Sequence, residues 1–275
     1  MPINYLRKIQ LGDFSDSGYR ISPSDEIAAA IEGFYVFSKE AKSDTHLVFN
    51  DGYPVLVFMQ NSNDTVSVIG QKDPTEINGA WASAGSIKNV YIRYNDNIAE
   101  LFIVRFHPAA FYQLFGVTTQ YFRHNPVASL DHIIKANTFD LAEFFMCNSI
   151  NEKVLFIEKY IQGSFKLVDA RAVFDRTLNY IHKLKGKSTV REITDIAGVN
   201  YKWLERNFKK NVGLLPKEYI QLQRFIHAYA DFAGTKDVDL MRIAISNGYY
   251  DSNHFLKDFK AYTGKTPMEY LKLQL

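Results

Sequence analysis

The chain has almost no cysteine: Cys147 is the single one among 275 residues. A disulfide within the chain is therefore excluded, and so is a zinc site built from several thiolates. Because Cys147 follows Phe144, Phe145 and Met146, we expect it to fill a small space in the core. No apolar run reaches the roughly 18 residues of a membrane helix. The first residues also lack the apolar segment of a secretory signal, so we expect a cytoplasmic protein with no membrane partner.

Sequence motifs for several kinds of catalysis are missing as well. The chain has no Gly-x-Ser-x-Gly, no phosphate-binding loop and no Gly-x-Gly-x-x-Gly, so acyl transfer and nucleotide chemistry have no support. Asp51 and Asp73 stand beside Gly or Pro, and turn formation explains them. The histidines of the first half lack the close His-x-His spacing of a metal site; they are His46, His107, His124 and His132. We expect no metal, no cofactor and no enzymatic activity.

Net charge is small, but it is unevenly distributed. Residues 1–167 contain 14 Lys and Arg against 18 Asp and Glu, a balance of −4. Residues 168–275 contain 18 against 12, a balance of +6. A basic segment joined to an acidic one is typical of a polyanion-binding part fused to a second module.

The first 110 or so residues have the pattern of β-strands. Short runs of β-branched and aromatic residues alternate with turn residues such as Asn50-Asp51-Gly52 and Asn78-Gly79. Strands are expected at 34–37, 47–49, 55–59, 66–69, 90–94 and 101–106. This spacing predicts a sandwich or barrel. Pro108 then opens a predicted helix from Ala109 to Phe115, ended by Gly116, and one or two helices follow within 139–161.

The second part of the chain contains an internal repeat. Residues 200–209 match residues 251–260 at a constant offset of 51 positions. The match continues from Gly213, Pro216, Glu218 and Tyr219 to Gly264, Pro267, Glu269 and Tyr270. Gly198 and Gly248 are 50 positions apart, as a one-residue difference in a turn would give. The same supersecondary unit therefore occurs twice.

Each copy has the parts of a helix-turn-helix motif. A short helix, 190–197 or 238–246, ends at a glycine that can adopt the left-handed conformation. Asn200 or Asp251 then caps a second helix, which has apolar residues on one face and basic residues on the other. The second helix of such a motif enters the major groove of DNA. Two of them should lie about one DNA turn apart, roughly 34 Å.

The outer faces of these two helices supply the expected contacts with double-stranded DNA. We expect base contacts from Lys202, Glu205, Arg206, Asn253 and Lys257. We expect contacts with the DNA backbone from Asn200, Tyr201, Lys209, Lys210, Asp251, Ser252 and Lys260. The alternative for Lys202 and Arg206 is contact with phosphate or solvent alone, and for Lys209, Lys210 and Lys260 it is a solvated helix end. Glu205 could accept a hydrogen bond from a cytosine amino group or repel phosphate.

Residues from about 170 to 275 resemble the DNA-binding domain of AraC/XylS-type transcription regulators. The second copy carries most of the resemblance, through Ile243-Ala244, Gly248-Tyr249, Asp251, Phe255, Phe259-Lys260, Gly264, Pro267 and Tyr270. It implies seven helices and a role in activating or repressing transcription, with RNA polymerase as a further partner. Two positions depart from the family pattern. Thr194 replaces an alanine, and Lys257 replaces a frequent arginine, which loses a bidentate fork to guanine.

The N-terminal part resembles an uncharacterised β-rich domain that is often fused to this DNA-binding module. The similarity lies in residues 31–35, 50–58 and 104–116 of a segment that runs from about 5 to 135. In the wider family this position holds a cupin-like domain that binds a ligand and dimerises. The resemblance implies a sensor and names no ligand, so the ligand-binding residues stay unknown at this point.

We therefore expect an α+β multidomain protein. Residues 1–135 form a β-rich, cupin-like sensing domain, residues 136–167 connecting helices that can form a homodimer, and residues 168–275 an all-α domain with helix-turn-helix motifs at 190–210 and 238–260. The expected function is sequence-specific regulation of transcription, modulated by a small-molecule effector. The alternatives are a constitutive DNA binder controlled by abundance or a partner protein, and an enzymatic N-terminal domain fused to a DNA-binding module. The operator, the effector and the direction of regulation do not follow from the sequence.

Overall fold

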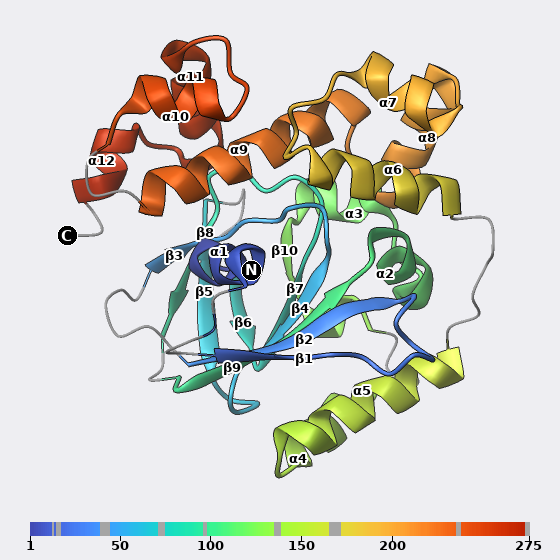
Figure 1. The fold of residues 1–275 in the computed structure, drawn as a ribbon. Coiled ribbons are helices and arrows are strands. Elements are labelled where there is room, and N and C mark those ends of the chain that lie inside the picture. Colours follow the sequence, from blue (N-terminus) through green and yellow to red (C-terminus); the bar gives the residue numbers. More distant parts are fainter. Residues whose placement is uncertain are drawn as a thin grey trace. The chain divides into compact units, whose positions relative to one another are not determined.

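The computed structural model divides the chain into two compact units, Met1–Leu167 and Val168–Leu275. The residues described are 1–12, 14, 18–38, 45–70, 75–95, 98–134, 139–164, 172–234 and 238–272 (Figure 1). The junction between the units, the predicted boundary at 135/136 and Asp73 all lie outside these ranges. Within them, no helix is long and apolar enough to cross a membrane.

The first unit is rich in β-structure. Its described residues form ten strands in two antiparallel sheets (Figure 1). The strands are β1 (Gly18–Ile21), β2 (Ile31–Ser38), β3 (Thr45–Leu47), β4 (Val55–Phe58), β5 (Thr65–Ile69), β6 (Thr75–Asn78), β7 (Ala80–Ser83), β8 (Tyr91–Tyr94), β9 (Glu100–Phe106) and β10 (Val127–Ser129). The larger sheet has the order β1-β2-β9-β4-β7-β10, and the smaller one the order β3-β8-β5-β6. The β-rich fold predicted for this unit is confirmed.

The larger sheet is buried on both faces. One face, which includes Phe34, Ala82 and Val104, forms a single apolar cluster with residues of the helices that follow β9. Those helices are α2 (Pro108–Phe115), α3 (Thr119–His124), α4 (Leu141–Met146) and α5 (Ile150–Ser164), with a short 3-10 helix, η1 (Leu130–His132), between α3 and α4. Alternate residues of a strand point to opposite faces, so Tyr35 and Trp81 lie on the other face of this sheet.

All six predicted strands are present, as β2, β3, β4, β5, β8 and β9. Strand β3 is displaced from the prediction and ends at Leu47, after which Val48 makes one isolated bridge to Pro2. The helix predicted after Pro108 is also confirmed: α2 ends where Gly116 adopts φ +62°. Strands β1, β6, β7 and β10 and helix α3 were not predicted, because elements of three to six residues give too few periodic positions.

The expectation of strands throughout the first 110 residues is wrong at the start of the chain, where α1 (Ile3–Leu11) is a helix. Its residues Ile3, Tyr5 and Leu6 are buried, and the ring of Tyr5 stacks on Phe37 of β2 with centroids 4.6 Å apart. Packing against the sheet therefore determines the conformation of this segment. The helix ends at Gly12, which adopts φ +64°.

The second unit is all-helical, as predicted, and has seven helices among its described residues. They are α6 (Ala172–Lys183), α7 (Val190–Ala197), α8 (Tyr201–Asn211), α9 (Pro216–Gly234), α10 (Leu240–Ser246), α11 (Ser252–Thr263) and α12 (Pro267–Lys272). The longest, α9, has 19 residues and spans about 28 Å at about 1.5 Å per residue. Within this unit α9 contacts α6, α7 and α8 as well as α10 and α11, so both copies of the repeat pack on one helix.

Candidate nucleic-acid interface

The first helix-turn-helix motif is formed by α7 and α8. Thr189 and Glu192 make a capping box at the start of α7: the Glu192 amide donates to Thr189 Oγ1 at 3.2 Å, and the Thr189 amide donates to Glu192 Oε2 at 2.7 Å. The helix ends at Gly198, whose φ of +66° only glycine adopts at low cost. Asn200 then begins α8, its Oδ1 accepting a hydrogen bond from the amide of Trp203 at 2.9 Å.

Helix α8 separates its apolar and basic faces cleanly. Leu204 and Phe208 are fully buried, while Lys202, Arg206 and Lys210 are exposed. Residues three or four positions apart share one side of a helix, so the predicted base and phosphate contacts of α8 lie together. One pair in this group is already engaged: Lys209 Nζ lies 2.5 Å from Glu205 Oε1.

The second motif, α10 and α11, repeats the same construction. Asp239 caps α10 by accepting from the Arg242 amide at 3.0 Å, which explains why the helix begins at Leu240 rather than at 238. Gly248 forms the turn with φ +79°. Asp251 caps α11, its Oδ1 accepting from the His254 amide at 2.8 Å. The turn residues and caps predicted from the repeat are therefore confirmed.

The outer face of α11 carries fewer charges than that of α8. Asn253, Lys257 and Lys260 are exposed at spacings of four and three residues, so they form one stripe. Phe255 and Phe259 are fully buried on the opposite side. The predicted residues of α11 are thus brought together on a surface that faces solvent.

Aromatic contacts fix α8 and α11, the second helix of each motif, to α9. Near the start of α9, the ring of Tyr219 lies 5.3 Å from that of Phe208 in α8. Further along α9, Phe225 and Phe232 lie 6.0 and 5.0 Å from Phe259 in α11. Each such aromatic pair contributes about 0.5–1.5 kcal/mol beyond the apolar area it buries.

Sequence reasoning missed one conspicuous residue at this surface, Tyr250. Its side chain is 88% exposed and immediately precedes the cap Asp251. Tyr201, at the first position of α8, is 48% exposed. An exposed aromatic ring is unremarkable in a sequence, because nothing local distinguishes it from a core residue. The sequence feature that could have identified Tyr250 is its position directly before α11, the second helix of the second motif.

Two family models match the chain. Residues 193–273 match a helix-turn-helix domain of the AraC type, which covers both motifs described above. The chain thus carries an AraC-type helix-turn-helix domain in its second unit. It is therefore a DNA-binding transcription regulator. Residues 19–128 of this AraC-type regulator match a second model, described as a domain of unknown function (DUF6597).

The chain is similar to several solved structures, among them ToxT from Vibrio cholerae. One ToxT crystal form has 14% sequence identity and a TM-score of 0.45, with 94% of this chain and 99% of that chain covered. Wild-type ToxT bound to an unsaturated fatty acid has 12% identity and a TM-score of 0.42, with 94% of each chain covered. The xylose-binding transcription activator XylR has 23% identity and a TM-score of 0.34, over 41% of this chain and 29% of that chain. No curated protein sequence matches the regulator.

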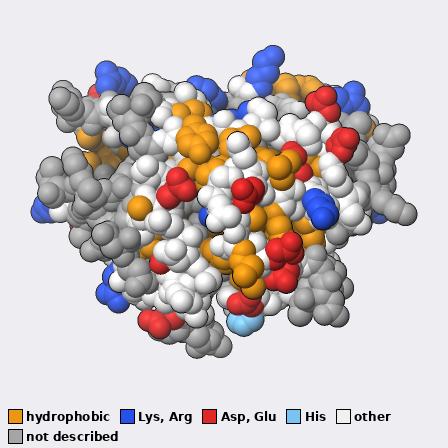
Figure 2. All heavy atoms as spheres, turned by 90° about the horizontal axis from the view of Figure 1, so that it is seen from below, with side chains coloured by type: hydrophobic (Ala, Val, Ile, Leu, Met, Phe, Trp, Pro, Cys, Tyr) orange, Lys and Arg blue, Asp and Glu red, His pale blue; other side chains and the backbone are white. Residues whose placement is uncertain are grey.

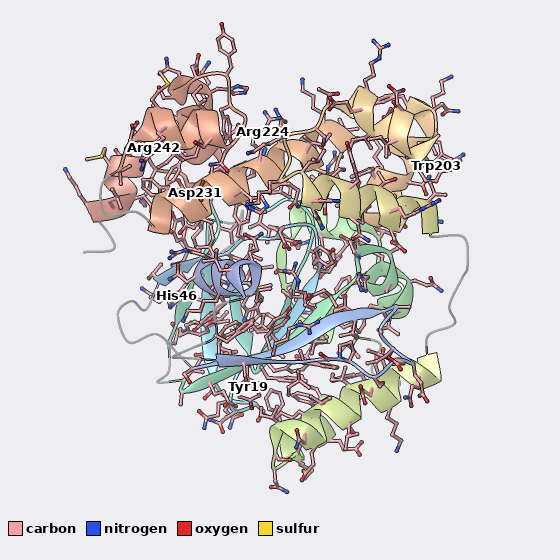
Figure 3. The ribbon with its side chains drawn as sticks, viewed as in Figure 1. Tyr19, His46, Trp203, Arg224, Asp231 and Arg242 are labelled. Atoms are coloured by element: carbon pink, nitrogen blue, oxygen red, sulfur yellow. The ribbon has the colours of Figure 1, made fainter. Side chains whose placement is uncertain are left out.

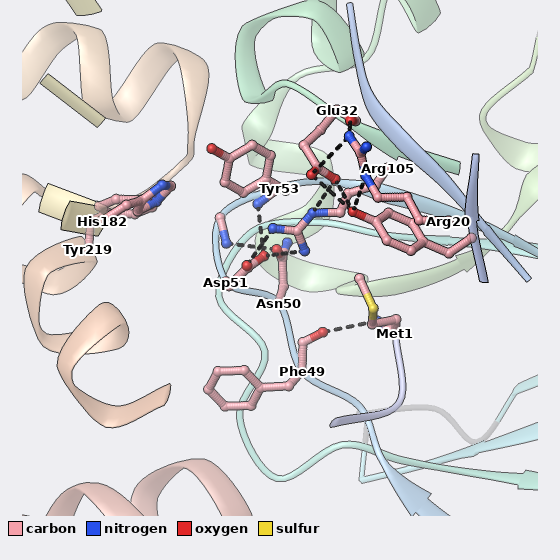
Figure 4. A network of polar contacts seen from close by, with 12 residues as sticks. Met1, Arg20, Glu32, Phe49, Asn50, Asp51, Tyr53, Arg105, His182 and Tyr219 are labelled. Carbon is pink, nitrogen blue, oxygen red and sulfur yellow. Dashed lines mark hydrogen bonds and ion pairs between the residues drawn. The ribbon is translucent and has the colours of Figure 1, made fainter. Parts of the chain in front are cut away.

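The N-terminal unit of the regulator contains a buried polar network (Figure 4). Arg105 in β9 donates to both oxygens of Asp51, at 3.1 and 2.6 Å, and its Nε lies 3.0 Å from Glu32 Oε2. Its guanidinium also lies over the ring of Tyr53, 4.3 Å from the centroid. Burial opposes the charge of Arg105, but the carboxylates of Asp51 and Glu32 outweigh burial and raise the pKa of Arg105.

Asp51 forms the predicted turn, but that explanation was incomplete. Asp51 Oδ1 accepts a hydrogen bond from the Tyr53 amide at 3.4 Å. In addition, each of the two carboxylate oxygens of Asp51 accepts one bond from Arg105. The amine of Met1 is buried nearby in this unit and donates to the carbonyl of Phe49 at 2.9 Å and to Ser83 Oγ at 3.0 Å. Burial lowers the pKa of this amine to about 4. Among the described residues, no cluster of His, Cys, Asp or Glu could hold a metal ion.

Helices α4 and α5 of the regulator expose a few large apolar side chains. Met146 of α4 is 78% exposed and Leu155 of α5 is 63% exposed. Figure 2 shows the face of the first unit that includes these helices, where hydrophobic and acidic side chains are interspersed. The prediction that Cys147 fills the core is wrong: it follows α4 as a half-buried residue, since the helix ends there and only Phe144 of the preceding aromatic pair is fully buried.

Proposed function

We propose that the regulator reads DNA with α8 and α11 in successive major grooves. The observation that carries this proposal is the symmetry of the second unit: two capped helices, each with a polar or basic outer stripe, are packed on one helix, α9. A second helix of a helix-turn-helix motif is the element that enters the groove.

Base recognition is assigned to the residues at the middle of each stripe. Arg206 can donate two parallel bonds to O6 and N7 of guanine, and Asn253 can pair with N6 and N7 of adenine. Lys202 and Lys257 donate to guanine as point charges, without the planar fork of arginine. Glu205 lies against Lys209, so it accepts from a cytosine amino group only where Lys209 turns toward a phosphate.

Contacts with the DNA backbone are assigned to the two ends of each helix. Tyr201 and Ser252 occupy the first positions of α8 and α11, where free amides attract phosphate. Asn200 and Asp251 use a side-chain oxygen as a cap, so their contact is made by the main chain. We add Tyr250, whose exposed hydroxyl can donate to phosphate. The remaining assignments are the lysines Lys209, Lys210 and Lys260.

Selection of binding sites from a randomised duplex pool, with the full-length protein at two salt concentrations, tests this proposal. We expect enrichment of two short sequence blocks about ten base pairs apart. Binding that depends steeply on salt but enriches no sequence would contradict base recognition, because phosphate contacts alone account for it. Arg206→Ala should relax the preference at one position of one block, at a cost of about 1–3 kcal/mol.

We infer further that a small molecule binds between the two sheets of the first unit. Trp81 of β7, in the larger sheet, and Tyr94 of β8, in the smaller one, are buried, and Trp81 Nε1 and Tyr94 Oη have no hydrogen-bond partner among the described residues. An unsatisfied buried donor costs about 1–3 kcal/mol, and a ligand with acceptor oxygens would remove this cost. Binding would then change the population of the DNA-competent form.

A thermal-shift screen of metabolites separates this sensor from a constitutive DNA binder. A ligand that binds only the folded state raises the melting temperature. The sensor predicts such a shift with wild-type protein and a smaller one with Trp81→Phe, which keeps an aromatic ring and removes the donor. RNA polymerase and a second copy of the chain are also proposed as partners. Sedimentation equilibrium that shows only monomer would contradict the homodimer.

A further inference from the structure

Arg224 lies in the middle of α9, between the parts of the second unit that belong to the two motifs (Figure 3). Its Nε donates to the carbonyl of Gly186 at 3.2 Å. Its guanidinium carbon lies 5.6 Å from the centroid of the Tyr249 ring. Gly186 belongs to the loop that leads into α7, and Tyr249 belongs to the turn between α10 and α11. One half-buried side chain therefore touches both the loop that leads into the first helix-turn-helix motif and the turn of the second.

The loop at Gly186 is seated directly on the backbone of α9. Gly186 adopts φ +68°, and a Cβ there would lie 2.4 Å from the Arg224 amide nitrogen and 2.5 Å from the carbonyl oxygen of Ile220. The next residue, Lys187, extends along Gly248 of the second motif, because a Cβ on Gly248 would lie 3.1 Å from Lys187 Cγ. The loop is thus in contact with α9 and with the second turn.

The contacts continue from Tyr249 to the second recognition helix. Tyr249 is buried, and its hydroxyl donates to Asp258 of α11 at 3.1 Å. Its ring also packs at 5.5 Å from Phe255 of α11. A continuous path of direct contacts therefore runs from the loop before α7, through Arg224 and Tyr249, to α11.

We propose that Arg224 is a positioning residue that fixes the separation and relative rotation of α8 and α11. Arginine suits this role because its planar group can donate a hydrogen bond while lying over an aromatic ring. The proposal rests on the proposed function, in which both helices read bases. Under this proposal, the allowed spacing between the two DNA sequence blocks depends on Arg224, although Arg224 contacts the bases of neither block.

The spacing of two blocks is a sensitive measure of this role. One added base pair moves a block by about 3.4 Å and rotates it by about 34° around the DNA axis. A rigid pair of helices cannot follow this change, whereas a pair that pivots about α9 can. Relaxed spacing is therefore the signature of lost positioning, and a loss of stability or charge alone would not produce it.

The test compares wild type with Arg224→Met in fluorescence anisotropy titrations. The duplexes are the operator selected with wild-type protein, the same operator with one or two base pairs inserted between its blocks, and a duplex that keeps one block. For Arg224→Met we expect about tenfold weaker binding to the intact operator, because the variant loses one hydrogen bond and one cation–π contact. The spacing ratio is the affinity for the intact operator divided by the affinity for the operator with two inserted base pairs. We expect this ratio to be at least about fivefold smaller for Arg224→Met than for wild type. The affinity of the variant for the single-block duplex should stay within about twofold of the wild-type value.

Arg242→Ala is the matched control, since Arg242 is an exposed arginine on α10 of the same unit. It removes one positive charge, and it should weaken all duplexes equally without changing the spacing ratio. If Arg224→Met loses its helical circular dichroism, Arg224→Lys replaces it, because lysine keeps the charge but cannot make both contacts at once. An unchanged spacing ratio in a folded variant overturns the inference while the proposed function stands. Wild-type protein that enriches no blocks overturns both.

Discussion

Arg105 and Asp51, which are 54 positions apart in the sequence, form a two-point ion pair inside the first unit. The two nitrogen–oxygen distances are 3.1 and 2.6 Å, and the side chains are 6% and 5% exposed. Breaking a buried pair costs about 3–5 kcal/mol where a charge is left uncompensated. Here Glu32, 3.0 Å from Arg105 Nε, would still offset part of that cost.

Asp51→Asn should therefore lower the free energy of unfolding by at most about 3–5 kcal/mol, measured by urea denaturation of the full chain. Asp195→Asn serves as control, because Arg191 and Asp195 are 4.0 Å apart and strongly exposed. Its effect should stay below about 0.5 kcal/mol. Equal effects of the two substitutions would mean that the Arg105 network does not stabilise the fold.

Two glycines with nearly the same backbone conformation should respond very differently to alanine. Gly198 has φ +66° and no other atom within 4 Å of a Cβ, so Gly198→Ala should cost only the strain of the left-handed conformation, about 1 kcal/mol. Gly186 has φ +68° but would place its Cβ against the backbone of α9. Gly186→Ala should lower the melting temperature by several degrees more than Gly198→Ala. Similar melting temperatures would contradict the close seating of this loop.

The caps of the second helices should contribute to stability separately from any contact with DNA. Asn200→Ala removes the acceptor for the Trp203 amide and should cost about 1 kcal/mol in thermal or urea unfolding without DNA. Asn200→Ser is the control, because serine also caps well and should restore most of the loss. An unchanged free energy of unfolding for Asn200→Ala would show that the cap does not contribute to stability.

Base-reading and phosphate-binding residues should be distinguishable by salt. Lys210→Ala should weaken binding to all duplexes alike and make the slope of log K against log salt shallower by about 0.9. Arg206→Ala should instead weaken binding to the selected operator more than to unrelated DNA, by about 1–3 kcal/mol. Both are measured by anisotropy at several salt concentrations. Identical behaviour of the two variants would contradict the assignment of Arg206 to bases.

Alkaline pH should destabilise the protein through its buried tyrosines. Burial, followed by the charge of Glu32, raises the pKa of Tyr35 to about 12, above the ordinary value of about 10. Above pH 10 the unfolded chain loses this proton first, so stability present below about pH 10 is lost as the pH rises toward 12. Denaturant titrations at increasing pH should show this decline, and Tyr35→Phe should make it smaller.

The second unit could be predicted closely from the sequence because its information is local and occurs twice. The caps Asn200 and Asp251, the glycine turns and the buried Phe208 and Phe259 all lie within a few positions of one another. Because the motif occurs twice, each feature predicted in one copy could be compared with the equivalent position of the other.

Relationships between distant residues could not be predicted in this way. Arg105 appears in the sequence as one residue of a strand, and its partner Asp51 as part of a turn. Arg224 lies on a helix, α9, and nothing local in the sequence indicates its contacts with Gly186 and Tyr249. The helix α1 was missed because the sheet on which it packs is formed by later residues. These features depend on the tertiary arrangement, which a pattern of neighbouring residues does not contain.

The position of Cys147 has a practical consequence. The chain has one thiol, and it is half-buried at the end of α4 rather than enclosed in the core. A maleimide dye can therefore be attached at a single defined place, in the unit that does not carry the DNA-binding helices. Burial raises the pKa of this thiol, with a further contribution from Glu152, so coupling will be slow at neutral pH and faster in mildly alkaline buffer. Labelled in this way, the regulator would allow the proposed effector binding and the proposed homodimer to be tested by fluorescence, with every residue of α8 and α11 left unmodified.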